Sequence, residues 1–470
     1  MFKKLLVFIL APALLLAGCN AHKSGETAAP SETVKTLAVR YDPSKYGEEW
    51  LKETAKAFEA DNPQVRVKLT ADTDILQTMA EALGSSSGLP DLALMPATNW
   101  QAYAKNGWLD DLTQLYAMNV DGETIQERIV PGLREYGRLG SSYYVLPWAD
   151  GLSGIFYNAD LFENNGWKVP ATSSELQDLL PQIKAEGIAP FAWAGKEQNF
   201  WGGVVTAWWG QVEGSEGIAS YLAMKNPEVY DQNGRYQALA FFEEIITNTT
   251  NSVENSQEMD TVAACEAFFR GKAAMMPGEA WMAAKYKSQI PQGFRMKIMT
   301  PPALGKAKTS ALVDTMSGDF ICIPARAAEK NLAESFAAYL ARDTTSELFY
   351  RQTGVPSAFN GMPSEAFLRE SAAASAAASG TASSGGASSA ASSGTATEWS
   401  DPFAQSVFEL YTRSAKLYMF SSKACYYNQF LDWPGSGEPY MSIFFGERNA
   451  KEVFEDDYQY AVENWSKANQ

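Results

Sequence analysis

The alternation of strands and helices after residue 35 is the feature that most constrains the fold of this chain. Runs of β-branched and aromatic residues predict strands at 36–41, 65–70 and 91–95. Amphipathic patterns between and after these strands predict helices at 48–60, 75–83 and 100–106. Because strands that alternate with helices form a parallel sheet covered by helices, we predict the α/β fold class.

The rest of the chain is predicted to be mainly helical, with a few further strands. Strands are expected at 143–146, 154–157, 294–299 and 319–323. Helical patterns dominate 174–285, 328–340 and 402–466. The pair Pro301-Pro302 is typical of a hinge. The segment 371–397 is almost wholly Ala, Ser, Gly and Thr, which bury too little apolar surface to become ordered, so we predict a disordered surface loop.

Composition excludes several classes of function. The formal net charge of −17 opposes binding to nucleic acid, because an acidic surface repels phosphates. The single histidine, His22, lies near the amino terminus, which removes histidine-dependent catalytic triads and most catalytic zinc sites. We therefore expect no cofactor and no metal. The distant cysteines Cys265, Cys322 and Cys425 are interpreted as buried free thiols, with one disulfide at most.

The first 35 residues have the pattern of an export signal followed by a tether. Lys3 and Lys4 precede the apolar run 5–15, which is typical of a signal peptide and too short to cross a membrane. The sequence Leu16-Ala17-Gly18-Cys19 resembles the lipobox of bacterial lipoproteins. This resemblance implies a signal peptide at 1–18, a diacylglycerol on the Cys19 sulfur and a lipidated tether at 19–35. The expected location is the outer face of the cell membrane, with the lipid as anchor.

Tryptophans and phenylalanines gather between residues 148 and 281, at Trp148, Phe191, Trp193, Phe200, Trp201, Trp208, Trp209 and Trp281. Aromatic faces can stack on the apolar faces of sugar rings, and a neighbouring carboxylate such as Asp150 can accept hydrogen bonds from hydroxyls. The stretch 147–151 offers both groups in a turn between two predicted strands, where α/β folds commonly bind ligands. The alternative is that these aromatic residues form the core.

Five stretches together resemble the extracellular solute-binding proteins of ABC importers, sugar-binding family 1. They are 50–67, 90–112, 144–162, 268–281 and 320–336. The resemblance implies a two-lobed periplasmic-binding-protein-like fold with a hinge and an interlobe cleft. By analogy, one lobe comprises 36–147 plus 303–350 and the other 148–302 plus 351–470. The loop 371–397 is then an insertion into the family pattern.

The resemblance also implies candidate ligand-binding residues. Trp281 matches a cleft tryptophan of the family, and Trp148 and Asp150 match a ligand-contacting loop. The resemblance adds candidates that follow the first and third predicted strands: Tyr41, Asp42, Thr98, Asn99 and Trp100. Trp193 and Trp201 are candidates from the aromatic group alone. Maltose binders of the family have a tryptophan where this chain has Met95, so maltose specificity is not implied.

The expected function is capture of a carbohydrate, expected to be an oligosaccharide, and its delivery to ABC transporter permease subunits. The protein is expected to act as a monomer and not as an enzyme. Three alternatives stay open. They are binding of another solute (a glycerol phosphate, polyamine or peptide), glycoside hydrolysis at the cell surface, and adhesion without a small ligand.

Overall fold

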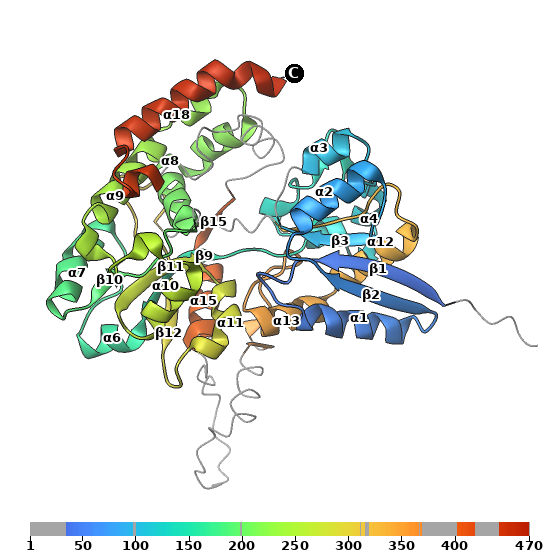
Figure 1. Ribbon diagram of the computed structural model, residues 1–470, viewed down its shortest axis with the longest axis horizontal. Helices are drawn as coiled ribbons and strands as arrows, with labels where there is room; N and C mark the ends of the chain where they lie inside the picture. Colours follow the sequence, from blue (N-terminus) through green and yellow to red (C-terminus); the bar gives the residue numbers. More distant parts are fainter. Residues whose placement is uncertain are drawn as a thin grey trace, which may run out of the picture.

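A computed structural model shows two α/β lobes, which confirms the predicted fold class (Figure 1). The structure describes residues 34–96, 100–197, 200–310, 312–314, 319–365, 367–368, 402–418 and 441–469. The predicted signal peptide, the lipid site at Cys19 and the predicted loop 371–397 lie outside these residues.

The first lobe is built on a five-stranded sheet with the strand order β2-β1-β3-β14-β8. Its strands are β1 (Lys35–Tyr41), β2 (Val65–Ala71), β3 (Leu92–Met95), β8 (Leu146–Pro147) and β14 (Phe320–Cys322). Strand β1 runs parallel to β2 and β3, whereas β14 is antiparallel to both β3 and β8. The predicted amino-terminal alternation is confirmed, with ends shifted by one or two residues.

Helices cover the sheet of the first lobe. They are α1 (Glu49–Asp61), α2 (Ile75–Ser85), α3 (Trp100–Lys105), α4 (Thr113–Tyr116), α5 (Ile125–Arg128), α12 (Lys330–Leu340) and α13 (Asp343–Thr353). Two small hairpins complete the lobe, β4 (Asn119–Val120) with β5 (Glu123–Thr124) and β6 (Arg138–Leu139) with β7 (Ser142–Tyr143). The buried face of α1 carries the five residues expected from its periodicity: Trp50, Leu51, Thr54, Ala55 and Phe58.

The second lobe has a four-stranded sheet with the order β10-β11-β9-β12. Its strands are β9 (Ser153–Asn158), β10 (Ala189–Phe191), β11 (Ala273–Glu279) and β12 (Met296–Met299). Strand β11 lies in a stretch that was predicted to be mainly helical. Its alanines and methionines favour helices, but pairing with β10 and β9 and complete burial of Ala273–Met276 override that preference.

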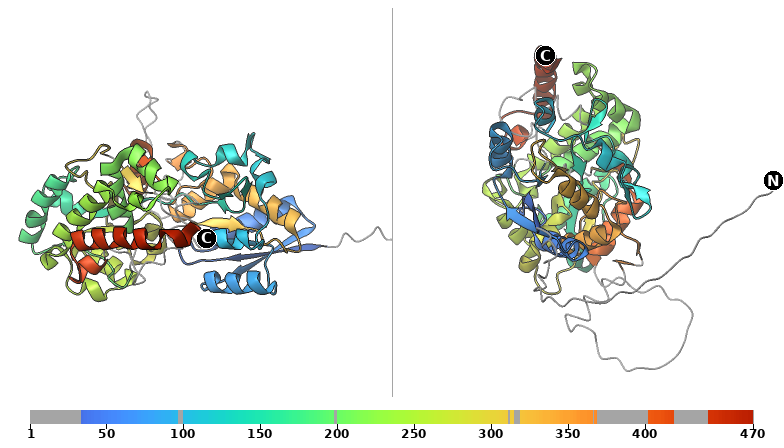
Figure 2. Two further views of the ribbon diagram at one scale, coloured as in Figure 1. Left: turned by 90° about the horizontal axis from the view of Figure 1, so that it is seen from above. Right: turned by 90° about the vertical axis from the view of Figure 1, so that its right-hand side faces the viewer.

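The second lobe also holds further helices, including one that is kinked at Gly214 and those nearest the carboxyl terminus. They are α6 (Ala159–Asn164), α7 (Ser173–Ala185), α8 (Gly202–Ala223), α9 (Asn233–Ile246), α10 (Thr261–Phe269), α11 (Trp281–Lys285), α15 (Pro402–Arg413), α17 (Met441–Phe444) and α18 (Ala450–Asn464). Figure 2 shows α18 lying along the second lobe, where it packs against α9. A short parallel pair, β13 (Leu312–Asp314) with β15 (Ala415–Leu417), packs on α8. Among the helices described, none is long and apolar enough to cross a membrane.

The packing assigns several segments to lobes differently from the analogy, including β13, which packs on α8 of the second lobe, and Trp148 and Ala149, which join the first-lobe core. Ala303 and Leu304 belong to the second lobe, since Ala303 bridges to Thr172 and Leu304 joins the core around β9. The carbonyl groups of Pro301 and Pro302 accept hydrogen bonds from Gln211 and Trp208 of α8, so this proline pair lies within the second lobe rather than between the lobes. Conversely, residues 355–359 pack in the first-lobe core.

Candidate functional site

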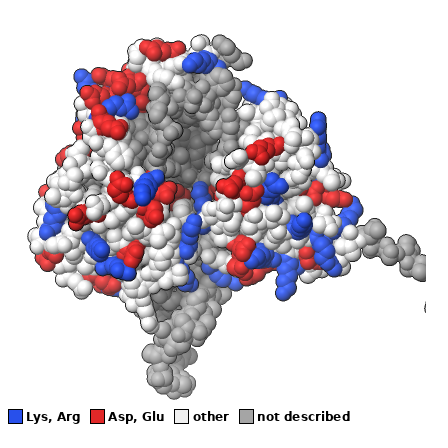
Figure 3. All heavy atoms as spheres, in the orientation of Figure 1, with Lys and Arg blue, Asp and Glu red and all other residues white. Residues whose placement is uncertain are grey.

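The candidate site is a cavity of about 270 Å³ between the lobes. Figure 3 shows acidic and basic side chains interspersed over the visible faces of both lobes. One lining residue comes from the first lobe and the others from the second: Lys45, Ser153, Glu197, Phe200, Gly203, Val204, Thr261, Gly278, Glu279, Trp281 and Met282. This mixture of apolar surface with a few polar groups is typical of a small-molecule site.

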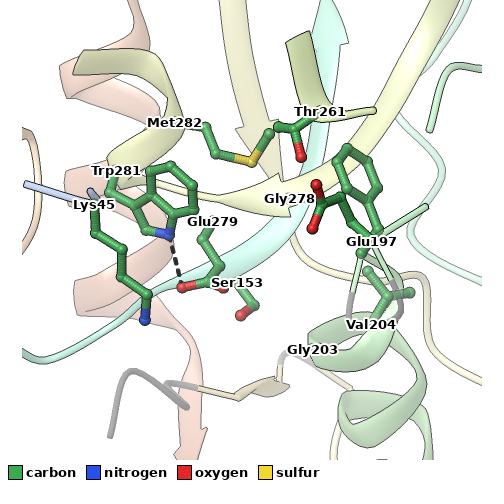
Figure 4. Close-up of a pocket in the computed structure, with 11 residues that line it drawn as sticks. Lys45, Ser153, Glu197, Gly203, Val204, Thr261, Gly278, Glu279, Trp281 and Met282 are labelled. Carbon is green, nitrogen blue, oxygen red and sulfur yellow. Dashed lines mark hydrogen bonds between the residues drawn. The ribbon is translucent and has the colours of Figure 1, made fainter. Parts of the chain in front are cut away.

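Trp281 supplies aromatic surface to the cavity, together with Phe200 (Figure 4). It begins α11, two residues after β11, and is only partly buried. Its indole N–H donates a hydrogen bond to Oε2 of Glu279 at 2.9 Å, which fixes the ring and the carboxylate relative to each other. The Nζ atom of Lys285 lies 5.4 Å from the centroid of the indole ring. Trp281 also packs against apolar clusters of both lobes, so it lies where the lobes meet.

Lys45 is the first-lobe contribution, and it extends toward Glu279 (Figure 4). Its Nζ atom lies 3.4 Å from Oδ2 of Asp319, which also accepts a hydrogen bond of 2.6 Å from the hydroxyl of Tyr46. Burial alone lowers the pKa of Lys45, but the carboxylates of Asp319 and Glu279 outweigh it and raise that pKa. The ammonium group is therefore charged at neutral pH.

Glu279 is the partly buried acid of the cavity. Burial raises the pKa of its carboxyl group above the usual range, Lys45 and the Trp281 hydrogen bond oppose this, and Asp319 adds to it. Burial likewise raises the pKa of Asp319, against the effect of Lys45. An ionised Glu279 would accept hydrogen bonds from ligand hydroxyls through two oxygens.

The amino end of α8 forms another part of the cavity wall. A side chain at Gly203 would place its Cβ atom 2.4 Å from Oγ of Ser153, so only glycine lets α8 begin this close to β9. Gly203 and Val204 belong to the first turn of α8 and line the cavity. The amide of Val204 already donates a hydrogen bond of 3.0 Å to the carbonyl oxygen of Trp201. Because the first amide groups of an α-helix lack a carbonyl partner one turn earlier, the amides before Val204 are the ones that can donate to a ligand.

The two lobes also touch directly beside the cavity. The ammonium group of Lys285 in α11 donates a hydrogen bond to the carbonyl oxygen of Ser44. The amide of Ser44 donates one of 2.7 Å to Oδ1 of Asp42. The negative charge of Asp42 acts to raise the pKa of both Lys45 and Lys285. This predicted residue therefore lies at the charged edge of the site.

Several other predicted ligand residues lie in the core or in the crossover between lobes. Trp148 is 8% exposed and stacks on Trp50, with ring centroids 5.0 Å apart. Asp150 is fully buried and accepts a hydrogen bond from the hydroxyl of Tyr411 in α15. Tyr41 is buried, and its hydroxyl donates to Glu48.

The remaining predicted tryptophans are completely buried in the lobes. Trp100 packs in the first lobe, and Trp193 and Trp201 pack in the second. The indole N–H of Trp193 donates a hydrogen bond of 3.0 Å to Ser252. Their faces are thus covered by protein. Thr98 and Asn99 lie outside the described residues.

The most informative residues that sequence analysis missed are Lys45, Glu279 and Ser153. Each lies close in the sequence to a predicted residue: Lys45 follows Asp42, Glu279 precedes Trp281, and Ser153 follows Asp150. Sequence proximity could therefore have suggested them. The side chain that enters the cavity could not be chosen without the fold.

The cysteines and acidic groups of the described region show no further reactive centre. Cys265 and Cys322 are free and buried, as predicted, and burial raises the pKa of each thiol to about 12. Cys425 lies outside the described part of the chain. Within that part, no group of three or more His, Cys, Asp or Glu side chains is arranged to hold a metal ion.

Comparison with known proteins connects this geometry to a family. The family model described as bacterial extracellular solute-binding protein matches residues 43–346. The multiple sugar-binding protein of Streptococcus mutans is 26% identical over 355 residues, covering 74% of this chain and 80% of that protein. The maltodextrin-binding protein MdxE of Bacillus subtilis is 24% identical over 388 residues, covering 77% and 81%.

Comparison with solved structures shows that the fold is also similar to that of solute-binding proteins. The apo form of RafE from Streptococcus pneumoniae superimposes with a TM-score of 0.67 at 20% sequence identity, covering 93% of this chain and 99% of that one. RafE in complex with raffinose gives a TM-score of 0.65, again with 99% of that chain covered. Two lobes with a cavity between them, and a family match over more than half of the 470 residues, lead to one conclusion: this chain belongs to the bacterial extracellular solute-binding protein family.

Proposed function

We propose that this protein binds an oligosaccharide in the cavity between its lobes and delivers it to the permease of an ABC transporter. The observation that carries the proposal is Trp281, whose partly exposed ring lies beside the fixed carboxylate of Glu279 in that cavity. An aromatic face suits the apolar side of a sugar ring, and a carboxylate suits its hydroxyls. No bond of the ligand needs to change.

The names of the relatives support a carbohydrate as ligand. The matched proteins include a multiple sugar-binding protein and a maltodextrin-binding protein, and RafE is known in complex with raffinose. Because these proteins differ in the sugars they are named for, the identity of the sugar does not follow from them. The carbohydrate class is what they share.

We assign roles to the cavity residues as part of this proposal. Trp281 stacks on the ligand, Glu279 and Ser153 bind its hydroxyls, and Lys45 reaches it from the first lobe. Asp42 acts at the edge through its charge on Lys45 and Lys285. Trp148 and Asp150 support the site from the core and the crossover.

A thermal-shift screen tests the proposed function. Raffinose, maltotriose, xylotriose and N,N′-diacetylchitobiose are added to the purified protein at millimolar concentration, with mannitol as a polyol control. A ligand at about 100 times its dissociation constant stabilises the native state by about 2.7 kcal/mol, which is a shift of several degrees. A screen in which no carbohydrate raises the melting temperature above the mannitol control would contradict the proposal.

The same proposal includes a lipid anchor at Cys19 and a position at the outer face of the membrane. It rests on the sequence Leu16-Ala17-Gly18-Cys19 after a basic and apolar leader. A tethered receptor stays close to its permease, which raises its effective concentration there.

A further inference from the structure

We propose that Glu279 is the residue that excludes anionic sugars, such as uronates and sugar phosphates, from this cavity. The inference rests on the proposed function and specifies the ligand class as uncharged. Glu279 lines the cavity beside Trp281, Gly278 and Ser153, and it faces Lys45 across the interlobe space (Figure 4).

Without Glu279, the cavity would no longer repel anions. On the first-lobe side, the charged ammonium group of Lys45 would then be balanced by Asp319 alone, 3.4 Å away. The amino end of α8 brings a partial positive charge from the second lobe, since Gly203 and Val204 line the cavity. The first turn of α8 contains no acidic residue, and the side chain of Trp201 makes no capping hydrogen bond to it. No acid within this turn neutralises the positive end of the helix.

Glu279 is placed to cancel the attraction of this helix end for anions. Its carboxylate cannot swing away easily, because Oε2 accepts the 2.9 Å hydrogen bond from the indole N–H of Trp281. Lys45 does not fully compensate its charge, because the ammonium group is already paired with Asp319 at 3.4 Å. One lysine therefore faces two carboxylates.

The other charged groups around the cavity do not change this balance. Glu197 also lines it, but its side chain is exposed, so solvent screens its charge. Lys285 interacts electrostatically with Asp42 and Glu197, and its ammonium group donates a hydrogen bond to the carbonyl oxygen of Ser44. A neutral sugar can donate hydrogen bonds from its hydroxyl groups to Glu279. It can also accept hydrogen bonds from backbone amides at the start of α8. An anionic sugar gains the second contact but is repelled at Glu279.

The variant Glu279→Gln tests the inference, because it keeps the shape and an acceptor for Trp281 while removing the charge. The matched control is Glu228→Gln. Glu228 is exposed in the turn Pro227–Tyr230, which follows the carboxyl end of α8, and it does not line the cavity, so the control makes the same change in net charge outside the site. Circular dichroism establishes that both variants are folded.

Calorimetric titration then compares raffinose, maltotriose and N,N′-diacetylchitobiose with their C6-oxidised uronate derivatives. We expect the wild type and Glu228→Gln to prefer the neutral sugar by at least tenfold. In Glu279→Gln this preference should fall at least fivefold, mainly through tighter binding of the uronate. Equal binding of neutral and uronate forms by the wild type, or an unchanged preference in Glu279→Gln, would overturn the inference while leaving the proposed function intact.

Inorganic phosphate provides a second measurement that needs no sugar. Quenching of tryptophan fluorescence by millimolar phosphate at low ionic strength should be saturable in Glu279→Gln and at least tenfold weaker in the wild type. If no neutral sugar binds but phosphate behaves in this way, the proposed function fails and the role of Glu279 stands. If phosphate binds both proteins alike, the role of Glu279 is refuted.

Discussion

The hydroxyl of Tyr411 donates a hydrogen bond of 2.5 Å to Oδ2 of Asp150, which connects α15 to the segment where the chain crosses between the lobes. The hydroxyl of Tyr418 approaches the same oxygen at 3.3 Å. The backbone N–H of Asp150 donates to the carbonyl oxygen of Pro356. Asp150 therefore holds three separate parts of the chain together at the crossover, which is a structural role for a residue predicted to bind ligand.

Replacing Tyr411 by Phe should destabilise the protein. The change removes the hydroxyl and leaves the fully buried Asp150 carboxylate with poorer solvation, at a cost of roughly 1–3 kcal/mol. Urea denaturation monitored by circular dichroism measures the loss. Asp150→Asn should lower stability as well, and the double variant should lose less than the sum of the two. A Tyr411→Phe protein as stable as the wild type would contradict this role.

Trp281 and Trp148 should respond differently to replacement by Ala. Trp281 lines the cavity, so its loss should weaken carbohydrate binding by about thirtyfold or more, which is roughly 2 kcal/mol. Trp148 packs against Trp50, Tyr46 and Phe349, so its loss should cost about 3–5 kcal/mol of stability. Both binding and unfolding are measured on each variant. Normal binding by Trp281→Ala would place the ligand elsewhere.

Glu279→Gln should raise the melting temperature of the ligand-free protein at neutral pH. Because burial raises the pKa of Glu279 in the folded state, protonation favours folding, and its stabilising effect is lost as pH rises through the folded-state pKa. The glutamine is uncharged at every pH, whereas Glu279 of the wild type becomes protonated as the pH falls. The difference in melting temperature between the two proteins should therefore shrink as the pH falls toward 4. Melting curves at several pH values measure the difference, and an advantage that grew on acidification would have the wrong sign.

Gly203→Ala should perturb both folding and binding, because the new Cβ atom would lie 2.4 Å from the Ser153 side chain. Overpacking of this kind costs about 1–3 kcal/mol. The second change Ser153→Gly removes the clashing atoms and should restore much of the lost stability. Thermal unfolding of the single and double variants provides the comparison. Failure of the double variant to recover would show that the contact does not limit α8.

Cys19→Ser should release the protein from the membrane or leave it unprocessed. The Cys19 thiol is the proposed attachment point, and a serine hydroxyl cannot form the thioether. Cell fractionation followed by mass spectrometry of the amino terminus distinguishes the two outcomes. An unchanged membrane fraction would contradict the proposed lipid anchor. Replacing the buried Cys265 by Ser is the control, since it should not alter fractionation.

The sequence by itself determined the α/β class, most element positions in the first lobe and the core face of α1. These follow from local periodicity, which repeats along the chain and needs no knowledge of distant residues. It also led to Trp281 through a family resemblance, and Trp281 lines the cavity.

Only the tertiary structure decided which polar side chains meet. Lys45, Glu279 and Asp319 are far apart in the sequence: the fold of the first lobe pairs Lys45 with Asp319, and the meeting of the two lobes brings Glu279 to the same cavity. The tertiary structure also places Trp193 and Trp201 in the core, and it makes Ala273–Met276 part of a strand although alanine and methionine favour helices. In each case burial and pairing with distant segments outweigh the local preference. These distant partners cannot be inferred from the local sequence.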